Sequence, residues 1–152
     1  ARSEARTAFA QTQEPVTLER LRVATLGRFV ALVPEIRSDA LDDLAASCVT
    51  QFDSFRAPLT ADELKRRKRA RLTALQEAHI GKWGYPYVLD EFRFHMTLTG
   101  KLPKAALPAT HAALQTALAG VVPDPFTIDS LCLVGEDEQG RFHLIHRHAL
   151  SG

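Results

Sequence analysis

The chain has 152 residues, of which 45% are hydrophobic and 24% are charged, and its formal net charge is +1. These proportions are ordinary for a globular protein of about one domain, and the near-neutral charge selects no partner by bulk electrostatics. Apolar runs are too short to cross a bilayer and no leader-like segment opens the sequence, so we expect a cytoplasmic protein without membrane contact.

The first half of the chain predicts a helix end, two strands and a long helix. Residues 5–11 are typical of the end of a helix, and residues 16–23 and 28–33 predict strands around a turn at Gly27. Ser38 is a candidate N-cap, and a 3.6-residue apolar stripe follows it. The members of this stripe are Leu41, Leu44, Ala45, Cys48, Val49, Phe52 and Phe55.

The second half predicts further helices, one isolated strand and a closing hairpin. Thr60 and Glu63 form a capping box for a basic helix, and Pro108 fits the first turn of another helix. The resulting order mixes helices and strands without regular alternation, which predicts an α+β protein with antiparallel pairing. The expected segments are helices over 72–80 and 107–119 and strands over 91–99, 126–134 and 141–148.

Two parts of the sequence resemble each other, at residues 5–33 and 114–148. Either the chain holds an internal repeat, or two helix–strand–strand units share a composition. The matching pairs are Pro15–Val23 with Pro125–Leu133, Gly27–Phe29 with Gly140–Phe142, and Thr7–Ala10 with Thr116–Ala119.

The repeat predicts that one strand lies outside this sequence. In the second copy, His95 precedes Thr116. The same distance counted back from Thr7, the matching residue of the first copy, gives a position upstream of residue 1. We therefore expect residues 1–152 to form one domain that lacks its N-terminal strands. The upstream region of the parent protein should carry a second histidine-bearing strand at that place.

The predicted strand over 91–99 carries the most promising chemistry. Alternation puts Phe92, Phe94, Met96 and Leu98 on a core face, and the intervening side chains on the other. His95 and Thr97 thus share a face, where an imidazole exchanges protons near neutral pH and a hydroxyl donates to a phosphate oxygen. We expect both to be catalytic residues for a phosphate ester, with Arg93 and Tyr87 as candidate substrate-binding side chains on the same face.

Other clusters give weaker signals. The basic run Lys65–Arg71 is either a solvated helix face or a track for a phosphate backbone, and it contains no aromatic residue for stacking on RNA bases. On a strand, His146 and His148 share one face and His143 points to the other, so no metal site is expected unless the strand has a bulge. Two distant cysteines predict neither a disulfide framework nor a zinc ribbon, and we expect no cofactor.

Several segments resemble a known family. Phe94–Gly100 is similar to the H-x-T motif of the two-histidine phosphoesterase superfamily, which includes RNA 2′,3′-cyclic phosphodiesterases. The longer segment Trp83–Gly100 resembles an uncharacterised branch of that superfamily associated with bacterial phosphonate-utilisation operons. Gly27–Pro34 and Phe52–Thr60 resemble the same branch, so the similarity covers nearly the whole chain.

The resemblance implies a bilobal fold with pseudo-two-fold symmetry and one H-x-T strand in each lobe. It also implies metal-independent hydrolysis of a cyclic phosphodiester or nucleotide-like ester, with two histidines as general acid and base. His95 and Thr97 match the second motif, whereas the first motif is absent. We therefore expect this chain alone to be impaired, and a non-catalytic module that binds a phosphate ester or RNA stays the alternative.

Overall fold

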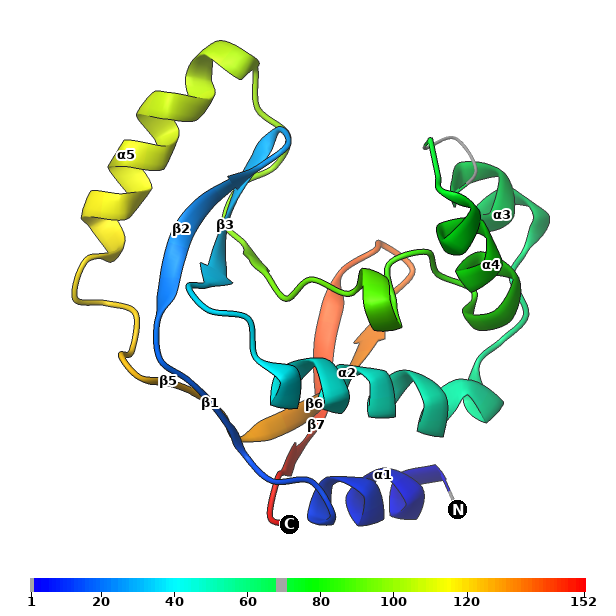
Figure 1. Cartoon of the computed structure of the whole chain (residues 1–152). Helices are drawn as coiled ribbons and strands as arrows, with labels where there is room; N and C mark the ends of the chain where they lie inside the picture. Colours follow the sequence, from blue (N-terminus) through cyan, green and yellow to red (C-terminus); the bar gives the residue numbers. More distant parts are fainter. Residues whose placement is uncertain (1, 68–70) are drawn as a thin grey trace. The chain divides into compact units, whose positions relative to one another are not determined.

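The computed structural model describes residues 2–67 and 71–152 and divides the chain into two compact units (Figure 1). The first, called here the terminal unit, consists of Ala1–Ile36 and Thr97–Gly152. The second, called here the middle unit, is Arg37–Met96. Each unit is described by itself.

The terminal unit contains two long helices and most of the strands. The bounds of its helices and strands agree with the predicted ones to within a few residues, with one kind of exception. The predicted strands over 16–23 and 126–134 are each split into two strands. The elements are α1 (Arg2–Gln11), β1 (Val16–Leu18), β2 (Leu21–Leu26), β3 (Phe29–Pro34), η3 (Lys104–Ala106), α5 (Leu107–Leu118), β5 (Phe126–Ile128), β6 (Ser130–Glu136) and β7 (Phe142–Ala149).

A three-stranded sheet in the order β2–β3–β4 contains the most buried part of the core. Gly27, with a φ of 59°, closes the β2–β3 hairpin in the left-handed region that glycine tolerates. Val30 and Ala31 are completely buried, and Leu32 nearly so. β4 (Met96–Thr97) is the third strand and lies next to β3. Helix α5 packs on the hairpin (Figure 1).

The two segments that resemble each other most closely in sequence pair with each other. β1 and β5 form an antiparallel ladder in which Thr17 lies directly opposite Thr127. The hydroxyl oxygens of these threonines are 3.2 Å apart, and the two residues are 110 positions apart in the chain. An antiparallel pair of similar segments centred on equivalent residues has an approximate local two-fold axis through that pair.

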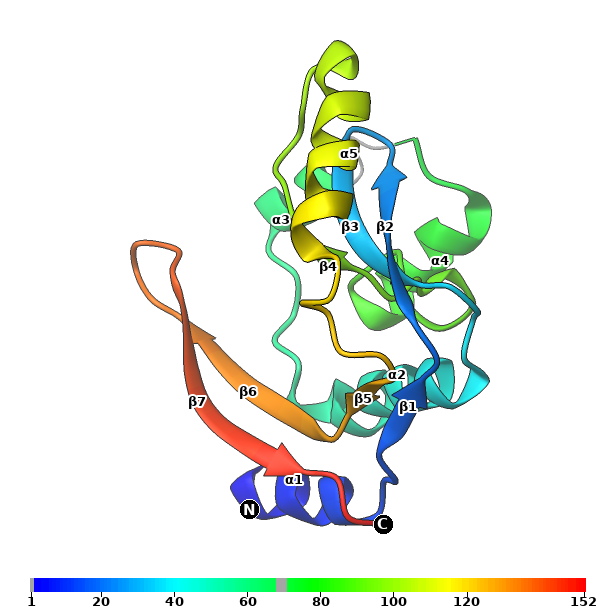
Figure 2. The same cartoon turned by 90° about the vertical axis from the view of Figure 1, so that its left-hand side faces the viewer.

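The third sheet is the β6–β7 hairpin, which helix α1 contacts (Figure 2). The hydroxyl of Thr7 in α1 lies 3.4 Å from Nδ1 of His148 in β7. Gly140, with a φ of 75°, closes the turn, and the amide of Asp137 donates to the carbonyl of Arg141. A register shift between Leu133 and Val134 makes a bulge within the ladder.

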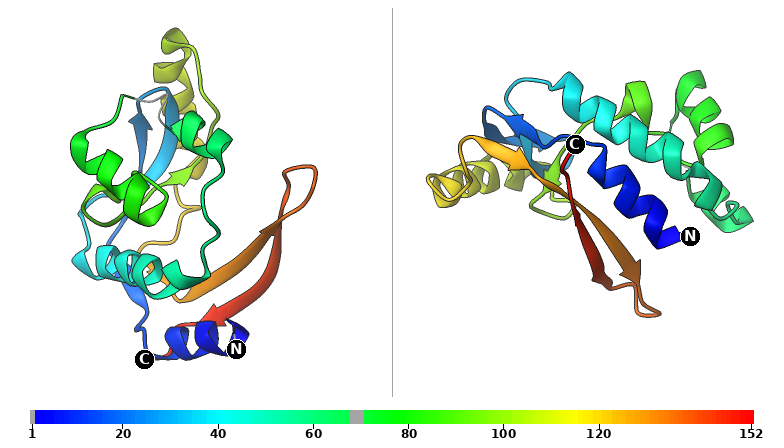
Figure 3. Two further views of the ribbon diagram at one scale, coloured as in Figure 1. Left: turned by 90° about the vertical axis from the view of Figure 1, so that its right-hand side faces the viewer. Right: turned by 90° about the horizontal axis from the view of Figure 1, so that it is seen from below.

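The middle unit is helical. The predicted caps are confirmed: the Ser38 hydroxyl accepts from the amide of Leu41, and Thr60 and Glu63 bond reciprocally at the start of α3. A further capping box, Thr73 with Gln76, begins α4. The elements are α2 (Asp39–Phe52), η1 (Asp53–Phe55), α3 (Ala61–Arg67), α4 (Ala74–Trp83) and η2 (Leu89–Glu91) (Figure 3).

The mixed composition of helices and antiparallel sheets confirms the α+β class. The predicted strand over 91–99 is wrong in its extent, because β4 contains Met96 and Thr97 alone. Glu91 ends a 3₁₀ helix, Phe92 is extended, and residues 92–95 have no regular secondary structure. No helix in the described ranges is long and apolar enough to pass through a lipid bilayer.

Candidate functional site

The segment that follows β4 is tied to the core by the backbone of Val30. The amides of Leu98 and Thr99 both donate to the Val30 carbonyl, at 2.9 and 3.2 Å. In return the Val30 amide donates to the Thr99 hydroxyl at 3.0 Å. Because Val30 is fully buried, these bonds fix the chain immediately after Thr97 on a rigid part of the fold.

His95 is an exposed side chain whose tautomer is fixed by its own backbone. Its Nδ1 lies 2.9 Å from the carbonyl oxygen of Arg93. A carbonyl only accepts, so Nδ1 carries the hydrogen and donates. In the neutral imidazole Nε2 then carries the lone pair, which is the form that a general base requires.

Thr97 is exposed in β4, two positions after His95. The boundary between the two units falls between Met96 and Thr97, so His95 belongs to the middle unit and Thr97 to the terminal unit. The expected core face is partly wrong. Phe92, Phe94 and Leu98 are half-buried, but Met96 is 40% exposed because the extended segment is not a continuous strand.

The two candidate substrate-binding residues lie in irregular segments. The Arg93 guanidinium turns back on its own backbone, where Nη1 donates to the carbonyls of Asp90 at 2.9 Å and Phe92 at 2.6 Å. Tyr87 is 44% exposed and meets Tyr85 edge to face, with ring centroids 5.7 Å apart. No strand extends to residue 87, so the shared-face argument does not apply to Tyr87.

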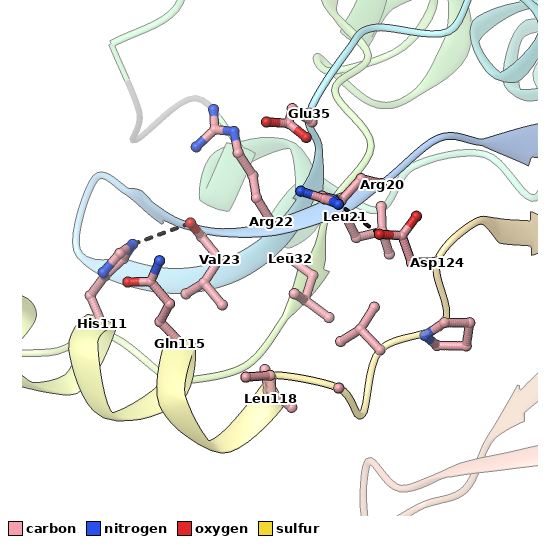
Figure 4. Close-up of a pocket in the computed structure, with 14 residues that line it drawn as sticks. Arg20, Leu21, Arg22, Val23, Leu32, Glu35, His111, Gln115, Leu118 and Asp124 are labelled. Carbon is pink, nitrogen blue, oxygen red and sulfur yellow. Dashed lines mark hydrogen bonds and ion pairs between the residues drawn. The ribbon is translucent and has the colours of Figure 1, made fainter.

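A cavity of about 730 Å³ lies in the terminal unit, between β2, α5 and the loop after α5 (Figure 4). The side chains of Val23, Leu32 and Leu118 give it an apolar floor. His111 donates from Nε2 to the Val23 carbonyl at 3.2 Å, and Arg20 pairs with Asp124 at 2.9 Å. The spacing of these residues in the sequence does not predict that they lie together.

A smaller hollow of about 300 Å³ in the middle unit is lined by Glu63, Arg66, Arg67 and Tyr85. The Arg67 guanidinium lies 5.1 Å from the centre of the Tyr85 ring, a cation–π contact. The basic run therefore has an aromatic neighbour that its own sequence lacks. Residues 68–70 of this run lie outside the described residues.

The C-terminal histidines make separate contacts. His143 Nε2 lies 2.8 Å from a carboxylate oxygen of Asp137, whereas the rings of His146 and His148 are 4.3 Å apart. Hydrogen bonds from His143 and from the Arg141 amide lower the pKa of Asp137. Within the described ranges no group of three or more histidine, cysteine or acidic side chains is placed to hold a metal ion.

Comparison with known proteins gives two similar curated relatives, both named "Ribose 1,5-bisphosphate phosphokinase PhnN". The one from Janthinobacterium sp. (strain Marseille) is 42% identical over 137 residues, and the one from Laribacter hongkongensis (strain HLHK9) is 31% identical over 120 residues. These matches cover 88% and 79% of this chain but 30% and 27% of the relatives, so the chain spans less than a third of their length.

No solved structure matches the chain. A family model matches residues 3–143, which is nearly the whole sequence. The chain therefore belongs to the family described as "Protein of unknown function (DUF1045)".

Proposed function

We propose that this chain supplies one half of a metal-independent phosphodiesterase site, with His95 as a general acid or base and Thr97 as a phosphate-binding hydroxyl. The observation that carries this proposal is the hydrogen bond from His95 Nδ1 to the Arg93 carbonyl. In the neutral imidazole it selects the tautomer in which Nε2 carries the lone pair.

The reaction needs a second proton-transfer group. Attack on a phosphodiester requires a base that activates the nucleophile and an acid that protonates the leaving oxygen. His95 fills one of these roles, and Thr97 donates to a non-bridging oxygen. We propose that the second imidazole belongs to an upstream strand of the longer protein, as the internal repeat predicts.

The β1–β5 ladder supports this two-lobed arrangement. Its centre, the Thr17–Thr127 pair, joins equivalent positions of the two similar segments. A protein built from two such halves around one axis presents two equivalent strands, one per half. His95 lies directly before the later of these strands, β4.

The name of the relatives points to another reaction, transfer of a phosphoryl group to a sugar phosphate. P-loop kinases hold phosphates with a glycine-rich G-x-x-x-x-G-K-[ST] segment. The nearest segment in this chain is Gly135–Phe142, which has Arg141 and Phe142 in place of the final pair and three acidic residues between its glycines. It forms the β6–β7 turn, with no helix after it.

We therefore propose that the kinase named in these relatives resides in the part of them that this chain does not cover. The present chain then contributes a phosphoesterase step to the same metabolism of phosphorylated sugars, in line with its resemblance to proteins of phosphonate operons. Purified chain incubated with a nucleoside triphosphate and ribose 1,5-bisphosphate should transfer no phosphate. Measurable transfer would contradict this division.

The phosphodiesterase proposal is tested on the full-length protein with a panel of cyclic phosphodiesters, including 2′,3′-cyclic nucleotides. His95→Ala should lower turnover by about 10²- to 10⁴-fold, the usual contribution of one acid–base group. Added chelator should have no effect. His143→Gln is the control, because it replaces another exposed histidine. The amide of the glutamine can still donate to Asp137. Equal turnover by the wild type and His95→Ala would remove His95 from the mechanism.

The alternative is a module that binds phosphate esters or RNA without hydrolysis. The Arg67–Tyr85 contact favours it, because it joins a cation to an aromatic face. Neutralising the basic residues of the run Lys65–Arg71, Arg67 included, should then abolish binding of a labelled oligonucleotide, whereas His95→Ala should not. If the chain is part of a phosphodiesterase, His95→Ala should lower hydrolysis of a cyclic phosphodiester far more than the substitutions in the basic run do.

A further inference from the structure

The β6–β7 hairpin exposes apolar side chains that a water-soluble surface normally covers. Phe142 is 73% exposed, Ile145 63%, Leu144 58% and Val134 47%. Single exposed apolar residues are common, but four on one short hairpin indicate an interaction surface.

Three of these side chains share one face of the hairpin. Val134 lies directly opposite Leu144, and Glu136 lies opposite Phe142. Opposed residues of an antiparallel pair point to the same side, and alternate residues along a strand do so too. Val134, Phe142 and Leu144 therefore lie on one face together with the carboxylate of Glu136, and these three apolar side chains are called here the hairpin patch.

The same residues of β7 present an open backbone edge. Asp137 donates its amide to the Arg141 carbonyl at 2.9 Å, which makes Arg141 a residue that bonds toward β6. Bonding direction alternates along an antiparallel strand, so the amide and carbonyl groups of Phe142 and Leu144 face away from β6. Within the ranges that the structure describes, this sheet consists of β6 and β7 alone.

In the other hairpin of the terminal unit, part of the edge of the second strand is bonded. There β3 is followed in the sheet by β4, and the outward carbonyl of Val30 accepts from both Leu98 and Thr99. Val30 is completely buried, in contrast to Phe142 and Leu144. In the β2–β3 hairpin the third strand and the segment after it bond the backbone edge of β3, and helix α5 packs on the hairpin.

We propose that a β-strand from the longer protein, upstream of α1, adds to the free edge of β7 and packs its side chains beside those of the hairpin patch. Two observations favour this occupant over a second copy. The relatives are more than three times as long as the matched segment, so they hold ample further chain. Helix α1 already packs on β7 through Thr7 and His148, so a segment joined to the start of α1 reaches this edge through a short connection.

The chemistry of the edge defines the strand it accepts. The strand is extended, presents backbone groups to Phe142 and Leu144, and places apolar side chains at alternate positions against the hairpin patch. Its identity as the carrier of the second catalytic histidine rests on the proposed function. Its docking on β7 does not.

Hydrogen exchange of the full-length protein, resolved to single amides, tests the docking. The outward amides of Phe142 and Leu144 should exchange at least tenfold more slowly in the full-length protein than in residues 1–152 alone. Equal exchange rates in both proteins would overturn the inference.

Two variants separate docking from general damage. Leu144→Asp should lower the melting temperature of the full-length protein and leave that of residues 1–152 nearly unchanged. Thr25→Asp is the matched control, since it places a charge at an exposed position of β2 away from this edge. An equal shift in both lengths would contradict the proposal, as would a concentration-dependent dimer of residues 1–152 that protects the same amides. Slow exchange with no hydrolysis of any diester leaves the docking intact and removes the proposed function.

Discussion

At the scale of single residues, His148 is a histidine whose pKa the fold lowers. It is 8% exposed, and its pKa is lowered, first by burial and then by the nearby charges of His146 and Arg6. The folded state therefore resists protonation of this imidazole more than the unfolded chain does. Below the ordinary histidine pKa of about 6.5 the unfolded state binds more protons, so the fold loses stability as pH falls.

The melting temperature should accordingly decrease between pH 7.5 and pH 5, and His148→Gln should reduce that decrease. Glutamine retains a polar contact for Thr7 but carries no titratable group. Melting curves at four pH values, with His143→Gln as the comparison, measure the effect. The assignment to His148 is wrong if both variants keep the wild-type slope.

His95 shows how a local contact can prepare an exposed side chain for chemistry. Its Nδ1 contact with the Arg93 carbonyl spans two residues and needs no distant partner. The sequence predicted the residue and its neighbour Thr97, because alternation and the motif both pointed to them. The sequence did not predict the hydrogen bonds of Arg93, whose guanidinium donates to the carbonyls of Asp90 and Phe92.

At the scale of elements, the Val30–Thr99 junction holds the end of the candidate site in place. Thr99 accepts from the Val30 amide and donates to the Gly100 carbonyl at 2.9 Å. Its hydroxyl thus completes an edge that β4 itself is too short to cover. The structural role of Thr99 depends on a contact with a residue 69 positions away in the chain.

Thr99→Val should lower the free energy of unfolding by about 1–3 kcal/mol, because it leaves the partly buried Val30 amide without its acceptor. Chemical denaturation measures this value. Thr97→Val, at an exposed position, should cost less than about 0.5 kcal/mol. Equal losses for the two variants would contradict the assigned role of Thr99.

Helices were predicted better than the central strand, for identifiable reasons. Ser38, Thr60 and Pro108 carry local signals of helix starts, and the structure uses all three as expected. The strand over 91–99 was predicted from alternation alone. Periodicity does not report whether a neighbouring strand is present, and β4 bonds to β3 over two residues only.

At the scale of the whole molecule, the central feature is that segments far apart in sequence meet around the Thr17–Thr127 pair. Sequence similarity suggested that these segments correspond, but it could not show that they pair with each other. The cavity beside α5 was equally beyond prediction, since it arises from packing of His111 and the Asp124 loop against β2. The second histidine and the separate kinase region are proposals about parts of the longer relatives that this chain does not cover.

The dependence of kcat/KM on pH, measured for the full-length protein with a hydrolysed cyclic phosphodiester, tests the account most directly. One imidazole acting as base and another as acid should give a bell-shaped profile. His95→Ala should remove one limb of the bell and lower the maximum by about 10²- to 10⁴-fold. A profile that keeps both limbs in His95→Ala, at an unchanged maximum, would contradict it.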